Sequence, residues 1–253
     1  MSNAGSDRST PPIARAQDQL FREPGSARQK YSALVVGRPG WAALVKHEAV
    51  VMLSQHIPGA FGLFMRKALY PRLLGACGHN VVFGQNVVVR HPGKIEIGDN
   101  VVIDDNCLLD AKGESNRGIR IGSGVFIGRN TILSCKNGDI EIADGANLGF
   151  NCEVFSASQV CIGRDALVAA YAYLIGGDHD FGDPGTPVIA QARRSAGITI
   201  GDGAWIGAGA KVLDGVSIGD RAIVGASAVV RENVPSGATA VGIPARILKS
   251  VNS

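Results

Sequence analysis

Histidine is the side chain best suited to take a proton from a hydroxyl group near neutral pH, because its usual pKa is about 6.5. The chain of 253 residues contains five histidines. Four of them lie early in the chain, whereas His179 lies far along it, between Asp178 and Asp180. His179 is therefore the leading candidate for a general base, provided that a rigid element holds it in place.

A repeat of six residues fills most of the chain and predicts that element. Twenty positions of the repeat are aliphatic or Phe, and ten of them are followed by Gly. This period fits neither a helix nor an alternating strand, and it predicts short strands joined by sharp bends, with one inward side chain per hexad. The positions are Phe83, Val89, Ile97, Ile103, Leu109, Ile121, Ile127, Leu133, Ile142, Leu148, Val154, Ile162, Val168, Leu174, Ile200, Ile206, Val212, Ile218, Val224 and Val230.

The interruptions of the repeat all follow a third hexad. Three hexads would form one triangular coil, so stacked coils would share an aliphatic core and carry their longer loops along one edge. The longest step, of 26 residues, runs from Leu174 to Ile200 and contains His179. Loops on a rigid scaffold often carry the chemistry, which favours this edge as the site.

Three further stretches accompany the repeat, at residues 177–181 (GDHDF), 200–207 (IGDGAWIG) and 241–246 (VGIPAR). Together with the repeat they resemble the hexapeptide-repeat acyltransferases over roughly residues 77–249. The resemblance implies an all-β fold, a left-handed parallel β-helix of about six to seven coils with a short N-terminal helical segment. It is closest to the maltose and galactoside O-acetyltransferases and to relatives in polysaccharide biosynthesis.

The resemblance also implies an activity, the transfer of an acetyl group from acetyl-CoA to a sugar hydroxyl. His179 matches the position of the family's catalytic base, and transfer would be direct. Asp178 or Asp180 could orient its ring, although relatives often use a backbone carbonyl. The expected assembly is a homotrimer, with coenzyme A held in a groove between subunits and with no metal. The acceptor would be a small-molecule or lipid-linked sugar rather than nucleic acid.

Several residues match the family's binding positions. Ala208 and Ala226 match small residues beside the pantetheine arm, and Trp205 matches an aromatic beside the acetyl end. Trp205 could instead be a trimer contact. Lys249 matches a basic residue near the nucleotide phosphates, and Arg231 is a second cation in a region that departs from the galactoside type.

The acceptor is expected to meet Asn151 and Asp178, although Asn151 could serve only as a turn residue and Asp178 as a solvated carboxylate. Arg193 and Arg194, late in the insertion, could contact phosphate or simply face solvent. A covalent route through Cys152 is disfavoured because no second base accompanies it, and the same holds for Cys135. Both Cys135 and Cys161 are expected to point outward.

Three other functions share this fold. Zinc-dependent carbonic anhydrases need three histidine ligands, and the spacing of His79 and His91 from His179 disfavours that class. A non-catalytic scaffold is a second alternative, which the retained loop around His179 argues against. N-acylation of an amino sugar is the third.

The chain divides into four predicted parts. Residues 1–40 are polar and without periodicity, which predicts a disordered or loosely attached arm. The apolar pattern of residues 41–76 predicts two amphipathic helices that cap the first coil. Residues 77–233 form the β-helix, with the catalytic loop at 175–199. Residues 234–253 should fold back over its other end.

The N-terminal third is basic, whereas the rest is slightly acidic. The predicted helices could cover the first coil with their apolar face, or could lie on a membrane surface near lipid-linked sugars. Five cysteines without a C-x-x-C motif, and no signal peptide, predict a reducing compartment. We therefore expect a cytoplasmic protein, with the inner face of the membrane as a further location.

Overall fold

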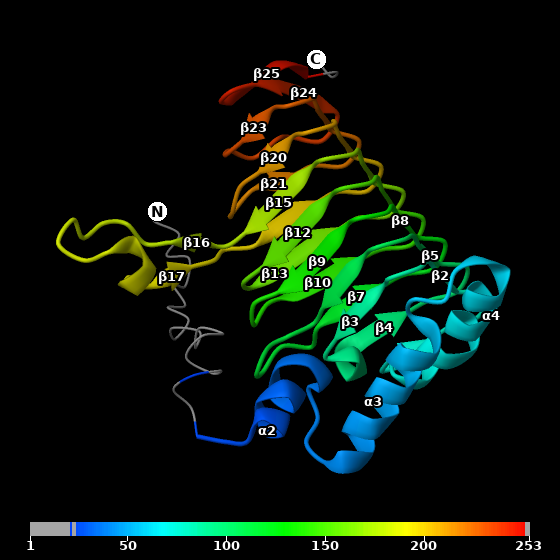
Figure 1. Ribbon diagram of the computed structural model, residues 1–253. Coiled ribbons are helices and arrows are strands. Elements are labelled where there is room, and N and C mark those ends of the chain that lie inside the picture. Colours follow the sequence, from blue (N-terminus) through cyan, green and yellow to red (C-terminus); the bar gives the residue numbers. More distant parts are fainter. Residues whose placement is uncertain (1–20, 22–23, 251–253) are drawn as a thin grey trace.

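A computed structural model describes residue 21 and residues 24–250, which form a triangular prism of stacked coils (Figure 1). Each coil contributes one strand to each of three sheets, here called sheets 1, 2 and 3. Sheet 1 contains β1 (Ala76–Cys77), β4 (Ile95–Ile97), β7 (Ile119–Ile121), β10 (Asp139–Ile142), β13 (Gln159–Ile162), β18 (Ile198–Ile200) and β21 (Ser217–Ile218).

The other two sheets complete the prism. Sheet 2 contains β2 (Val82–Phe83), β5 (Val102–Ile103), β8 (Phe126–Ile127), β11 (Asn147–Leu148), β14 (Leu167–Val168), β19 (Trp205–Ile206), β22 (Ile223–Val224), β24 (Ala238–Gly242) and β25 (Ala245–Ser250). Sheet 3 contains β3 (Val88–Arg90), β6 (Leu108–Asp110), β9 (Ile132–Cys135), β12 (Glu153–Ser156), β15 (Tyr173–Gly176), β20 (Lys211–Val212) and β23 (Val229–Val230).

The core of the prism is built by the repeat. All twenty positions predicted to point inward are buried, and none is more than 4% exposed. The strand register stacks these inward positions from one coil to the next: Leu148, for example, lies beside Ile127 of the preceding coil and Val168 of the following one. Burial of one such side chain stabilises the fold by about 1.5–3 kcal/mol. The predicted left-handed parallel β-helix is confirmed.

The described residues form seven complete coils, and the chain begins an eighth at Val234, which pairs with Ile218, and continues it through β24. The sequence pattern predicted six to seven because its first coil lacked one hexad. Cys77 fills that place: it pairs with Ile97 in sheet 1. Cys135 corrects a second expectation, because it lies two residues after Leu133 on β9, therefore faces the same side, and is fully buried. Cys161 lies on the outer face of sheet 1, as predicted.

Part of the predicted N-terminal arm forms short helices beside the first coil. Residues 24–40 include α2 (Ala27–Tyr31), which Ser26 begins with a capping box, and the π-helix η1 (Ser32–Val36). The η1 segment is fixed to the first coil, since the N–H of His91 donates to the carbonyl of Val35 at 2.7 Å. The remaining residues of the predicted arm, 1–20 and 22–23, lie outside the described residues.

Two longer helices, α3 (Trp41–Ser54) and α4 (Gly59–Leu69), lead through the 3-10 turn η2 (Tyr70–Arg72) to the first coil. The contact with the coil includes two polar anchors as well as apolar packing. Arg66 donates to the carbonyl of Phe83 at 2.9 Å, and Tyr70, whose ring packs against that of Phe83, donates to the carbonyl of Val87 at 2.8 Å. The apolar side chains expected at this contact, such as Phe61 and Phe64, are exposed instead. The helices therefore lie against the coil in the reverse of the expected orientation.

The other end of the prism is covered by a hairpin. Strand β24 continues sheet 2 in parallel with β22, and β25 returns antiparallel to it. Val234, Ala238 and Ala240 are buried beneath this end of the core. None of the helices in the described part of the chain is long and apolar enough to span a bilayer.

Candidate active site

The longest insertion forms a hairpin that projects from the corner between sheets 3 and 1 (Figure 1). After β15, the strand β16 (Asp178–His179) pairs antiparallel with β17 (Arg193–Arg194), which places His179 opposite Arg193. Asp180 and Arg194 form an ion pair at 3.0 Å across the hairpin. The tip beyond them includes a 3-10 turn, η4 (Val188–Ala190). Arg194 is thus paired within the hairpin, and its side chain is also 67% exposed to solvent.

The base of the hairpin is fixed by a carboxylate that the sequence pattern did not single out. Asp214 accepts hydrogen bonds from the N–H groups of Ala196, at 2.8 Å, and Gly197, at 2.9 Å. The hydroxyl of Ser195 donates to the carbonyl of Gly176 at 3.0 Å, which joins the two ends of the hairpin. These contacts hold the strand that carries His179 against the prism.

The ring of His179 is half-buried, and its Nδ1 atom is buried without a partner among the described residues. Neither neighbouring carboxylate orients it. Asp178 accepts from the backbone N–H of His179 at 2.7 Å, and Asp180 pairs with Arg194. Of the alternatives for the group that orients the ring, a contact from either acid is thus not seen within the single chain, while the backbone hydrogen bond places Asp178 beside His179.

Trp205 lies on a different side of the prism. It is on β19, on the outer face of sheet 2, and is 48% exposed. Leu167 and Ile223 flank it on the neighbouring strands and are also exposed. Trp205 is therefore part of an apolar stripe on this face, which suits either predicted role, a coenzyme contact or a subunit contact.

Ala208 and Ala226 are exposed on successive turns at the corner between sheets 2 and 3. These turns are closely packed: the N–H of Ser227 donates to the carbonyl of Ala208 at 2.8 Å. A Cβ at Gly207 would lie only 2.6 Å from the backbone nitrogen of Ala226. Small residues therefore leave the backbone of this corner accessible, as a narrow slot for a pantetheine chain requires.

Asn151 lies on the same corner, two coils before Ala208. Its φ of 54° is left-handed, a conformation that Asn tolerates well, so it does act as a turn residue. Beside it Phe150 and Tyr171 are exposed and pack edge to face at 5.6 Å, and Arg129 lies 5.4 Å from the ring of Phe150. The sequence analysis missed this cluster, although its two aromatic residues occupy turn positions of the repeat.

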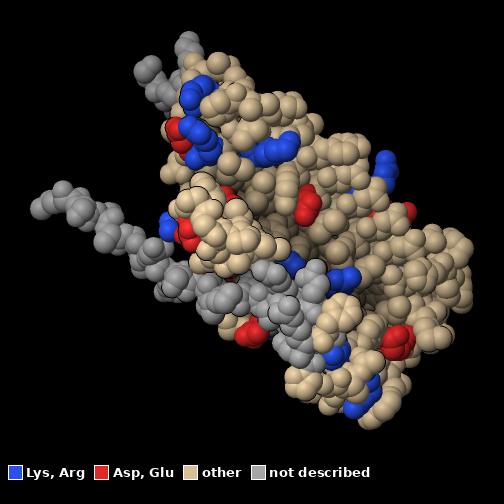
Figure 2. All heavy atoms as spheres, turned by 60° about the vertical axis from the view of Figure 1, so that its left-hand side comes forward, with Lys and Arg blue, Asp and Glu red and all other residues tan. Residues whose placement is uncertain are grey.

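Two predicted cations lie toward the C-terminal end. Arg231 follows β23, is exposed, and approaches Glu232 at 4.0 Å. Lys249 is on β25, paired with Thr239. Seen from the side of the hairpin, basic side chains lie toward this end of the prism and also toward the opposite end (Figure 2). Both residues thus lie toward the same end of the prism, and within one chain neither lies on the hairpin that carries His179.

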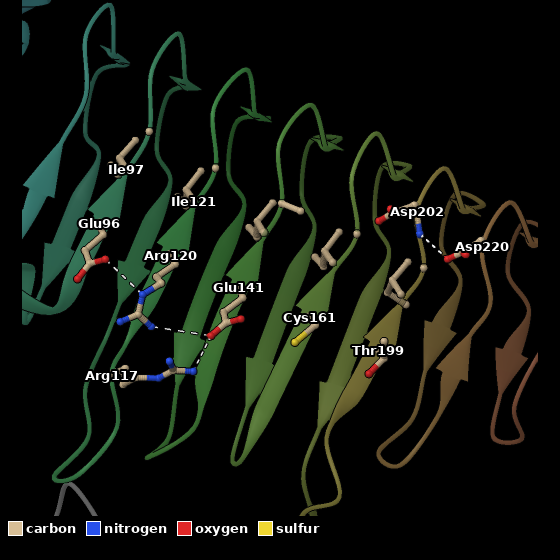
Figure 3. Close-up of a pocket in the computed structure, with 18 of the residues that line it drawn as sticks. Glu96, Ile97, Arg117, Arg120, Ile121, Glu141, Cys161, Thr199, Asp202 and Asp220 are labelled. Atoms are coloured by element: carbon tan, nitrogen blue, oxygen red, sulfur yellow. Dashed lines mark hydrogen bonds and ion pairs between the residues drawn. The ribbon is translucent and has the colours of Figure 1, made fainter.

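A groove of about 930 Å³ runs along the outer face of sheet 1 (Figure 3). Arg120 lies between Glu96, at 3.2 Å, and Glu141, at 3.8 Å, so its charge is balanced inside the groove. Cys161 also lines it, and burial raises the pKa of its thiol. None of the residues predicted for the active site lines this groove.

The remaining candidates for covalent or metal chemistry are scattered. Burial raises the pKa of Cys135 to about 12 and also raises the pKa of Cys152, so both thiols are protonated near neutral pH. His79 is exposed in the first coil, and His91 is buried under the helical segment. In a single chain neither lies on the hairpin that carries His179.

Comparison with known proteins identifies the class. The pattern of the family "Bacterial transferase hexapeptide (six repeats)" matches residues 197–232, and that of "Hexapeptide repeat of succinyl-transferase" matches residues 77–111. The putative lipopolysaccharide biosynthesis O-acetyl transferase WbbJ of Escherichia coli is 30% identical over 155 residues, which cover 58% of this chain and 76% of WbbJ. The chain therefore belongs to the hexapeptide-repeat acyltransferases.

Other relatives extend this picture. The probable acetyltransferase Rv3034c of Mycobacterium tuberculosis is 31% identical over 132 residues, 52% of this chain but only 44% of Rv3034c, so the match spans less than half of that relative. A mutant of AntD, an N-acyltransferase from Bacillus cereus solved with dTDP and coenzyme A, is 25% identical with a TM-score of 0.53, covering 74% of this chain and 89% of AntD. The polysialic acid O-acetyltransferase OatWY shares the fold, with 22% identity, a TM-score of 0.53 and coverage of 70% and 82%.

Proposed function

We propose that this protein is an acetyl-CoA-dependent O-acetyltransferase that acts on a sugar hydroxyl, with His179 as the general base. The observation that carries the proposal is the position of His179. It is held on the longest insertion of a hexapeptide-repeat prism, and the base of that insertion is tied down by Asp214. Its relationship to WbbJ, which is named as an O-acetyl transferase, supports hydroxyl as the acceptor group.

In the proposed reaction, His179 accepts the proton of the acceptor hydroxyl through Nε2 as the oxygen attacks the thioester carbonyl carbon. A backbone N–H stabilises the tetrahedral oxyanion that forms. The C–S bond then breaks, the acetyl group stays on the acceptor oxygen, and the departing thiolate takes the proton from the imidazolium. The elevated pKa values of the Cys135 and Cys152 thiols favour this direct route over an acyl-cysteine intermediate.

The active site of this proposal is shared between subunits of a homotrimer. Within one prism His179 and the Trp205 face are on different sides, so a site that uses both needs two copies of the chain. The neighbouring subunit would supply the pantetheine slot along Ala208 and Ala226.

The acceptor is proposed to lie over the corner that carries Asn151. The exposed rings of Phe150 and Tyr171 offer a flat apolar surface for a sugar ring, and Arg129 provides a cation for an acidic or phosphorylated group. Arg231 and Lys249, toward the C-terminal end of the prism, are assigned to the phosphates of coenzyme A.

One observation favours a second candidate, N-acylation of an amino sugar. AntD, which is 25% identical with a TM-score of 0.53, is an N-acyltransferase solved with dTDP and coenzyme A. The same base and slot would serve an amino group, so the experiment must establish whether the acetyl group is transferred to a hydroxyl or to an amino group.

The purified protein should be incubated with acetyl-CoA and a panel of free, nucleotide-linked and lipid-linked sugars while thiol release is followed. We expect acceptor-dependent thiol release and a product that alkaline hydroxylamine deacetylates, since under these conditions it cleaves oxygen esters but not amides. A hydroxylamine-resistant product would favour the N-acyltransferase. No acceptor-dependent release with any class of sugar would contradict both.

A further inference from the structure

The two helices α3 and α4 expose apolar side chains and bury polar ones, which is unusual for helices on a surface that faces water. Six large apolar side chains on them, here called the apolar face, are between 55% and 78% exposed: Trp41, Val45, Met52, Leu53, Phe61 and Phe64. The polar residues His47, Ser54 and Arg66 of the same helices are buried against the protein. A helix on an aqueous surface normally shows the opposite arrangement.

This orientation is held firmly. The Arg66 guanidinium donates to the carbonyls of Phe83 at 2.9 Å, Ser54 at 3.1 Å and Ile57 at 2.7 Å, so it links both helices to the first coil. At Gly62 an added Cβ would collide with the carbonyl oxygen of Ile57, so α4 can approach the connecting loop only because this residue has no side chain. The helices cannot turn over without losing these contacts.

The charge around the apolar face is positive. Glu48 is the only acidic residue in the sequence from residue 37 to residue 95. Its carboxylate accepts from the hydroxyl of Tyr31 at 2.7 Å. Lys46, Lys67 and Arg72 are exposed on α3, α4 and η2. An apolar surface bordered by cations complements a bilayer that contains anionic lipids.

We infer that α3 and α4 bind the surface of an anionic lipid bilayer, with the apolar face inserted at the level of the headgroups and Lys46, Lys67 and Arg72 over lipid phosphates. A second copy of the chain fits this face less well. A symmetric contact would place the same cations opposite each other, and like charges at an interface oppose association. Because α3 and α4 form an end of the prism in Figure 1, the hairpin with His179 is left free.

The test is co-sedimentation of the full chain with vesicles of phosphatidylcholine alone or with about one third phosphatidylglycerol. We expect binding to the anionic vesicles that weakens in high salt. Exchange of both aromatic residues of α4, Phe61→Ser with Phe64→Ser, should lower the bound fraction at least tenfold. Leu248→Ser is the matched control, because Leu248 is 67% exposed at the other end of the prism, and it should bind like wild type.

Equal binding of the α4 double variant and wild type would overturn the inference, as would no binding of wild type to anionic vesicles. Light scattering at several protein concentrations tests whether a second copy of the chain occupies the face instead. If wild type forms an oligomer larger than a trimer, and the α4 variant does not form it, the face would be assigned to a second copy. Thiol release with a soluble acceptor should be unchanged in the α4 variant. Vesicle binding requires no acyl transfer, so it can fail or succeed independently of the proposed enzymatic function.

Discussion

His179 and Trp205 lie on opposite sides of the same prism. His179 projects from the corner between sheets 3 and 1, whereas Trp205 is on the outer face of sheet 2, which is the side opposite that corner. If both residues serve one reaction, each active site combines the hairpin of one subunit with the sheet 2 side of its neighbour. The predictions below follow from this arrangement and from the contacts that hold the hairpin.

Replacement of the proposed base should abolish most of the activity without affecting the fold. We expect His179→Ala to lower kcat at least 100-fold, the usual scale of general base catalysis. His79→Ala is the control, because His79 is fully accessible in the first coil, and it should retain wild-type rates. Unchanged thermal unfolding together with a near wild-type kcat in His179→Ala would remove this residue from the mechanism.

Asp214 should act as a positioning residue. Asp214→Ala removes the acceptor for the N–H groups of Ala196 and Gly197, so the hairpin should loosen and kcat should fall about tenfold or more. Asp144→Ala is the matched control, since Asp144 accepts a backbone N–H from Ser123 in a turn away from the hairpin. Limited proteolysis should cut the hairpin faster only in Asp214→Ala. Equal proteolysis and equal kcat in both variants would contradict the assigned role.

The buried thiols should be dispensable for turnover. Because burial raises the pKa of Cys152, its thiolate is scarce near neutral pH, and Cys152→Ala should keep kcat within about threefold of wild type. Steady-state kinetics at saturating acetyl-CoA measure this directly. A drop as large as that of His179→Ala, together with an acetylated cysteine in the wild-type protein detected by mass spectrometry, would establish a covalent route.

The helical segment should make stability depend on pH through His91. Burial lowers the pKa of this ring below its usual range, against the opposing effects of the Ala33 carbonyl and Asp110. The unfolded chain then takes up a proton below about pH 6.5 that the folded chain does not, so the free energy of unfolding falls as the pH drops through that range.

We therefore expect the Tm of wild type to fall more than that of His91→Gln between about pH 8 and pH 5.5. Glutamine keeps an N–H that can donate to Ala33 in place of Nε2, which lies 2.8 Å from that carbonyl oxygen, but it does not titrate. Calorimetric scans of the two proteins at matched ionic strength give the comparison. Parallel Tm profiles would exclude His91 as the source of the pH dependence.

The prism could be predicted from sequence because its signal is repeated in every coil. A side chain such as Leu148 is constrained by its neighbours Ile127 and Val168, so twenty positions report the same geometry independently. The insertion that contains His179 could be located because it is the longest interruption of that regular period. The resemblance to known acyltransferases then supplied the role of the histidine.

Other features could not be predicted because their signal was ambiguous. The apolar periodicity of α3 and α4 indicated a buried face, but Arg66 and Gly62 instead fix the polar side against the coil. Cys135 was expected to point outward although β9 runs four residues and turns it inward. Asp214 resembled the many turn aspartates of the repeat, so nothing in its spacing marked it as an anchor of the hairpin.

Subunit complementation tests the shared site most directly. His179→Ala removes the base, and Ala208→Trp should fill the pantetheine slot on a different corner, so each variant alone should be inactive. If each site takes His179 from one subunit and Ala208 from the next, randomly mixed trimers should recover about one quarter of the wild-type activity, since one site in four receives both intact residues. No recovery in mixed trimers of confirmed composition would contradict the account.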